Sequence, residues 1–71
     1  MVRAIVLVTS PKKLIAARLR KVKSVYESFP VNGQFDAVAK IQVKQLSEIK
    51  EITTEIQKIN GVERTETMVE V

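Results

Sequence analysis

The fold is decided in the middle of the chain, where residues 23–43 read KSVYESFPVNGQFDAVAKIQV. Two runs with alternating apolar residues, 23–30 and 35–43, flank the dipeptide Asn32-Gly33. Alternation is typical of strands, and Asn-Gly favours a type I′ hairpin turn, in which both central residues have positive φ. We therefore expect two antiparallel strands joined by a tight turn.

The two predicted strands differ in how their faces are composed. In the first we expect Val25 and Phe29 on one face, and the terminal Pro30 favours a sheet edge because proline cannot donate a ladder hydrogen bond. In the second, every other residue is apolar, which predicts one continuous buried face: Phe35, Ala37, Ala39, Ile41 and Val43.

Helical patterns lie on both sides of this hairpin. Ser10 and Pro11 predict the start of a helix ending near Lys21, because serine is a favoured N-cap and proline suits the first helical position. A second helix is predicted over 46–59, with a stop at 60–61. The inward residues recur at helical spacing: Ile15, Leu19 and Val22 in the first, and Leu46, Ile49, Ile52, Ile56 and Ile59 in the second.

A strand is predicted at each end of the chain. Residues 2–9 are apolar on both faces, which indicates a central strand, whereas residues 62–71 have mixed faces. The order is βαββαβ, in one domain over residues 1–71. Short connections and right-handed crossovers favour an α+β, ferredoxin-like fold: a four-stranded antiparallel sheet, two helices on one face, first and third strands central.

This arrangement leaves one face of the sheet without helices. The central first strand nevertheless places Ile5 and Leu7 on that face. A chain of 8.0 kDa buries only about 60% of its unfolded surface, and it has no cysteine for a disulfide. We therefore expect a homodimer that packs sheet against sheet.

Composition limits the chemistry that is possible. The absence of cysteine and histidine excludes thiolate metal sites and the commonest general base. Glu51 and Glu55 lie one turn apart on an exposed helix face, as solvated residues do. We expect no enzyme, no cofactor and no metal. A small dimeric enzyme acting on an organic acid stays an alternative, since fold does not exclude activity.

The net charge of +4 is unevenly distributed. The first 35 residues carry seven basic residues and one acid, whereas the remainder carries five and seven. A solvated outer helix face explains this pattern, and a basic nucleic-acid-binding module is the second alternative. The apolar run at 4–8 is too short for a secretory signal or a membrane span, which favours a cytoplasmic protein.

Three short motifs in this frame resemble a known family. They are the hairpin sequence NGQFDA at 32–37, the helix-to-strand sequence INGV at 59–62, and TET at 65–67. Together they are similar to the C-terminal effector domain of the Lrp/AsnC transcription regulators, the RAM domain. The resemblance covers essentially the whole chain.

The resemblance implies a function and a site. RAM domains form sheet-to-sheet dimers that assemble into octameric or decameric rings, and they bind a free amino acid between dimers near a Gly-x-x-Asp hairpin. Here that motif is Gly33 to Asp36, with Thr65 and Thr67 nearby; Asn32, Gln34 and Phe35 follow by proximity. The expected function is an amino-acid-binding module that modulates transcription of amino-acid metabolism genes.

The sequence opens directly on the first predicted strand. We therefore expect a stand-alone RAM protein, without the helix-turn-helix of the full-length relatives and without direct DNA binding, whose partner is a full-length Lrp/AsnC regulator.

Each site residue has a structural and a functional interpretation. Gly33 is explained by the turn itself, or it lets a ligand carboxylate reach backbone N–H groups. Asp36 pairs with a neighbour such as Lys40, or it accepts the ligand's ammonium group. Thr65 and Thr67 are strand formers, or their hydroxyls close a polar pocket.

Overall fold

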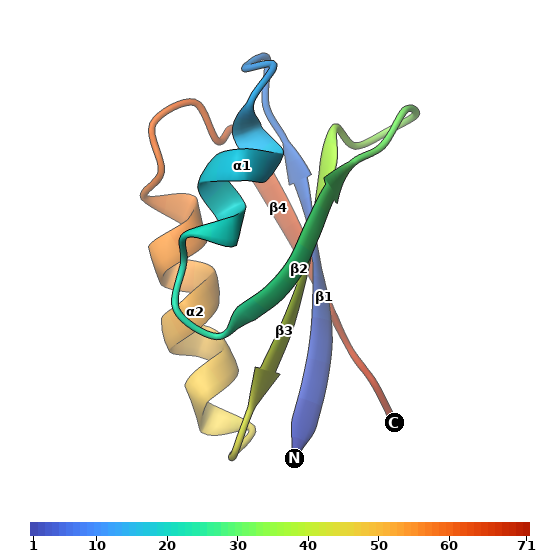
Figure 1. Ribbon diagram of the computed structural model, residues 1–71. Coiled ribbons are helices and arrows are strands. Elements are labelled where there is room, and N and C mark those ends of the chain that lie inside the picture. Colours follow the sequence, from blue (N-terminus) through green and yellow to red (C-terminus); the bar gives the residue numbers. More distant parts are fainter.

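The computed structural model describes residues 1–71 and has the predicted order of elements (Figure 1). The order along the chain is β1(Val2–Thr9), α1(Ile15–Arg20), β2(Val25–Pro30), β3(Ala37–Val43), α2(Ser47–Gln57) and β4(Arg64–Val69). The strands form one antiparallel sheet in the order β2-β3-β1-β4. The ferredoxin-like fold and the central positions of the first and third strands are confirmed.

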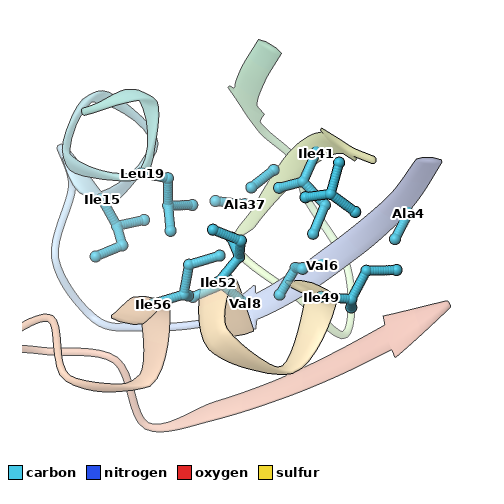
Figure 2. Close-up of a cluster of buried hydrophobic side chains, with 12 residues drawn as sticks. Ala4, Val6, Val8, Ile15, Leu19, Ala37, Ile41, Ile49, Ile52 and Ile56 are labelled. Atoms are coloured by element: carbon cyan, nitrogen blue, oxygen red, sulfur yellow. The ribbon is translucent and has the colours of Figure 1, made fainter. Parts of the chain in front are cut away.

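Both helices cover the same face of the sheet (Figure 1). The core lies between them and consists of aliphatic side chains from the two central strands and both helices (Figure 2). Its twelve residues are Ala4, Val6, Val8, Ile15, Leu19, Ala37, Ala39, Ile41, Val43, Ile49, Ile52 and Ile56. Neither helix is long and apolar enough to cross a membrane.

The prediction that the first helix starts at Ser10 and Pro11 is wrong. The Ser10 hydroxyl accepts a hydrogen bond from the Lys12 N–H at 3.1 Å, which closes a local turn instead of capping a helix. The helix begins only at Ile15, and its N-cap, Leu14, makes no side-chain capping bond. The Ser10 N–H also donates to Asp36, which holds Ser10 directly after the end of β1.

A β-bulge changes the faces of the edge strand. Val25 pairs with Ile41, but Glu27 pairs with Lys40, so two residues of β2 correspond to one step on β3. The register shift places Val25 on the face of the sheet that the helices cover, the helix face. It places Phe29 on the opposite face, which no helix covers, the open face. The prediction that these two side chains share a face is wrong, because one extra residue inverts a period-2 pattern.

The hairpin between β2 and β3 is longer than a type I′ turn. Six residues, 31–36, connect the strands, and the Val31 N–H donates to the Asp36 carbonyl at 3.0 Å. Gly33 has a positive φ of 148°, but Asn32 does not have a positive φ. The tight-turn prediction is therefore wrong, and β3 begins at Ala37 instead of residue 35.

The second helix is shorter than predicted. It covers 47–57, and Leu46, which the spacing placed in the core, is 62% exposed. Gly61 has a positive φ of 101°, as expected of a residue that ends a helix region. A Cβ on Gly61 would lie only 2.6 Å from Cγ of Lys12, so the lysine side chain crosses closely over this turn.

Candidate functional site

The hairpin loop projects from one end of the sheet and is open to solvent (Figure 1). Asn32, Gly33 and Gln34 are exposed, and a Cβ built on Gly33 would meet no atom within 4 Å. Glycine is favoured here by its backbone conformation, since φ of 148° is rarely adopted by other residues. The free space means that a ligand can approach the backbone N–H groups of the loop.

Asp36 anchors the loop to the end of the central strand. Its Oδ2 accepts a hydrogen bond from the Ser10 N–H at 2.7 Å, and its own N–H donates to the Val8 carbonyl at 2.8 Å. The other carboxylate oxygen, Oδ1, has no hydrogen-bond partner in the chain. One oxygen therefore positions the side chain, and the other remains able to accept a cationic group.

The expected structural pairing of Asp36 with Lys40 does not occur. The Lys40 Nζ instead lies 3.2 Å from Oε1 of Glu27, in an ion pair on the open face of the sheet. Asp36 precedes β3 and is held beside Ser10, whereas Lys40 is in the middle of that strand.

Thr65 and Thr67 lie on the other side of β1. They pair with Val8 and Val6, which places their side chains on the helix-covered side of β4. The Thr65 hydroxyl accepts a hydrogen bond from Nε2 of Gln57 in α2 at 3.0 Å. Within one subunit, β1 separates these threonines from Asp36.

No cavity of the single subunit contains Gly33 or Asp36. Thr65 lines a cavity of about 390 Å³ together with Gln57, Val62, Glu63 and Arg64. A separate cavity of about 290 Å³ lies on the open sheet face; its lining residues are Arg3, Ala4, Ile5, Tyr26, Lys40, Met68, Val69 and Glu70. The predicted site residues therefore form two groups, the exposed hairpin and the threonines of β4.

Two residues beside the hairpin were not singled out from the sequence. The guanidinium carbon of Arg64 lies 5.6 Å from the ring centroid of Phe35, a cation–π distance. Thr9 pairs with Arg64 across the sheet, and its buried hydroxyl has no hydrogen-bond partner in the chain. Only the strand register brings these residues together, because 55 positions separate Thr9 from Arg64 in the sequence.

Similar solved structures have the same fold over the whole chain. TTHA0845 from Thermus thermophilus is 29% identical, with a TM-score of 0.90, over 100% of this chain and 94% of that chain. FFRP-DM1 is 25% identical with a TM-score of 0.87, and both chains are fully covered.

Longer proteins share the fold over part of their length. A feast or famine regulatory protein from M. tuberculosis, solved in complex with L-methionine, is 20% identical with a TM-score of 0.84. The match covers 100% of this chain and 50% of that protein. No curated protein sequence matches this chain.

The sequence itself matches a family over almost its full length. Residues 3–71 match the Lrp/AsnC ligand binding domain. This match agrees with the βαββαβ fold that the similar solved structures share. The chain therefore belongs to the Lrp/AsnC ligand-binding domain family.

Proposed function

We propose that this chain is a regulatory module that binds a free amino acid at the hairpin around Gly33 and Asp36. The observation that carries the proposal is the state of the Asp36 carboxylate: one oxygen is fixed by the Ser10 N–H and the other is unpaired. A fixed carboxylate with a free oxygen is suited to an ammonium group, and such charge-assisted bonds contribute about 1.5–3 kcal/mol.

The open backbone beside Gly33 supplies the complementary half of the site. Loop N–H groups can donate hydrogen bonds to an anion, and the absent side chain lets a carboxylate approach. An α-amino acid carries both charges on adjacent groups. The L-methionine complex of the M. tuberculosis protein, which has the same fold, supports this ligand class.

The exposed hairpin is completed by assembly in this proposal. A single subunit has no cavity around Gly33 and Asp36, so the remaining walls, including Thr65 and Thr67, are supplied when subunits meet. A ligand held between dimers binds only the assembled form, and it shifts the oligomer population by that difference in affinity. The assembly that fits the family resemblance is an octameric or decameric ring.

The open sheet face supports a dimer as the building block. Its exposed apolar residues include Ile5 at 37%, Phe29 at 38% and Met68 at 46%. Exposed apolar side chains that gather on one face of a sheet are typical of interaction sites, and two sheets can pack face to face through them.

The regulatory output follows from mixed assembly. A full-length Lrp/AsnC regulator has the same domain, so its subunits offer similar contact surfaces. Co-assembly would transmit the amino-acid signal to transcription of amino-acid metabolism genes, with the DNA contacts made by the partner.

Light scattering after size-exclusion chromatography, with and without each standard amino acid, tests the proposal. We expect a mass above that of a dimer and a change of mass or melting temperature with a few amino acids. Gly33→Glu, which fills the open space, and Asp36→Ala should abolish the response.

Glu51→Ala is the matched control, since it removes an exposed carboxylate of α2 that makes no ion pair. A plain dimer that is indifferent to every amino acid would contradict the proposal. Screens for nucleic-acid binding and for turnover of organic acids would then be the next experiments.

A further inference from the structure

The structure places an unpaired cation beside the proposed anionic anchor. The Arg64 guanidinium lies over the ring of Phe35, the residue that precedes Asp36. Arg64 makes no ion pair, because the one ion pair of the chain joins Lys40 and Glu27. A cation and an anion thus flank the loop without neutralising each other.

The sheet register explains why they stay separate. Arg64 pairs with Thr9, the last residue of β1. Asp36 accepts a hydrogen bond from Ser10, the residue that follows Thr9. The ring of Phe35 is half-buried, and the guanidinium of Arg64 packs over it. Both charged side chains therefore lie around the end of β1, Asp36 held by a hydrogen bond and Arg64 by a cation–π contact.

We propose that Arg64 receives the α-carboxylate of the bound amino acid while Asp36 receives its ammonium group. Arg64 contacts Phe35, the neighbour of Asp36 in the chain, yet the two charges form no ion pair. A zwitterion carries one charge for each of them, so it can bind both residues at once. A guanidinium presents a planar set of donors that fits a carboxylate bidentately, and it complements the loop N–H groups beside Gly33.

The buried Thr9 hydroxyl lies next to the strand position of Arg64. It lies on the face of β1 that bears Arg64, and it has no partner in the chain. A buried hydroxyl without a partner is rare, so the chain leaves an unsatisfied polar group at the end of β1 beside Arg64. The inference rests on the proposed amino-acid function and assigns the residue that selects for a free carboxylate.

The test compares a ligand with and without its negative charge. Calorimetry would measure the affinity of the full chain for the tightest-binding standard amino acid and for the carboxamide of that amino acid. In the carboxamide a neutral amide replaces the α-carboxylate, and the ammonium group is kept. The wild type should prefer the acid by about tenfold to a hundredfold, the range expected for a charged hydrogen bond.

Variants assign that preference to a residue. Arg64→Gln should reduce the acid-to-amide ratio to the smaller preference that the loop N–H groups supply alone, and Arg64→Lys should retain part of the difference. Arg18→Gln, which removes the same charge from the exposed face of α1, should leave the ratio unchanged. The ratio is insensitive to general losses of stability or assembly, since these affect both ligands equally.

The possible failures are distinguishable. If the wild type binds no amino acid, the proposed function fails and this assignment fails with it. If the wild type binds and Arg64→Gln keeps the full acid preference, the role of Arg64 is overturned while the amino-acid function stands.

Discussion

The two faces of the sheet differ strongly in burial, although both bear aliphatic side chains. Along β1, Val6 and Val8 are fully buried under the helices, whereas their neighbour Ile5 is 37% exposed. On the helix face the chain itself removes the side chains from water. On the open face the same strand bears Ile5, which the subunit covers only in part. The helix face thus stabilises the monomer, and the open face is suited to stabilise an assembly.

The largest expected effect separates these two roles. Ile41→Ala empties a fully buried position on the helix face, and such changes cost about 2–5 kcal/mol of unfolding free energy. We expect this loss at every protein concentration, because the contacts are within one subunit. Urea unfolding at low and at high protein concentration would measure it.

Ile5→Ala is the matched change on the open face. Its destabilisation should be small in dilute solution and should grow as the protein assembles, since the contacts it removes are between subunits. A loss for Ile5→Ala that equals that of Ile41→Ala and does not depend on concentration would break the comparison.

A smaller loss of stability is expected when the hydrogen bond between the edge strand β2 and helix α1 is removed. Ser28 is 1% exposed, and its hydroxyl donates to the Ala16 carbonyl of α1 at 2.7 Å. Ser28→Ala should cost about 1 kcal/mol in thermal or urea unfolding, the usual contribution of one hydrogen bond. Ser47→Ala, at the exposed start of α2, is the control. Equal melting temperatures for both variants would contradict a role for Ser28 in holding β2.

The smallest effect is expected on the open face. The Glu27–Lys40 ion pair has side chains that are 50% and 41% exposed, and exposed pairs of this kind contribute about 0–1 kcal/mol. Glu27→Gln should therefore change the stability of the monomer little, and added salt should remove the difference. A loss above about 1 kcal/mol would show that this face is more desolvated than the monomer indicates, as in a tight dimer.

Periodic segments were the part of the fold that sequence reasoning predicted well. The alternation correctly predicted Ala37, Ala39, Ile41 and Val43 on the buried face of β3, and the two-sided apolar pattern of 2–9 correctly predicted a central strand. Phe35, which was predicted on the same face, lies in the loop before β3 and outside the core. Buried positions recur with the period of a strand or a helix, so apolar residues recur at the same spacing in the sequence. The order of elements followed from such periodic segments, whereas the family resemblance came from the short motifs at 32–37, 59–62 and 65–67.

Local irregularities were predicted poorly. The bulge between Val25 and Glu27 and the six-residue connection at 31–36 each depend on how two strands come into register. The helix start at Ser10 failed for a similar reason: a tertiary hydrogen bond from its N–H to Asp36 holds Ser10 at the strand end. Local preference was overridden by contacts that are distant in sequence.

The candidate site divides in the same way. The sequence alone determined the fold class, the family and the candidates Gly33 and Asp36, because turn geometry and a short motif are local properties. Only the tertiary structure decided that Asp36 is tied to Ser10, that Thr65 and Thr67 lie beyond β1, and that Arg64 rests on Phe35. Those outcomes depend on strand order and register, which arise from packing the whole chain around its core.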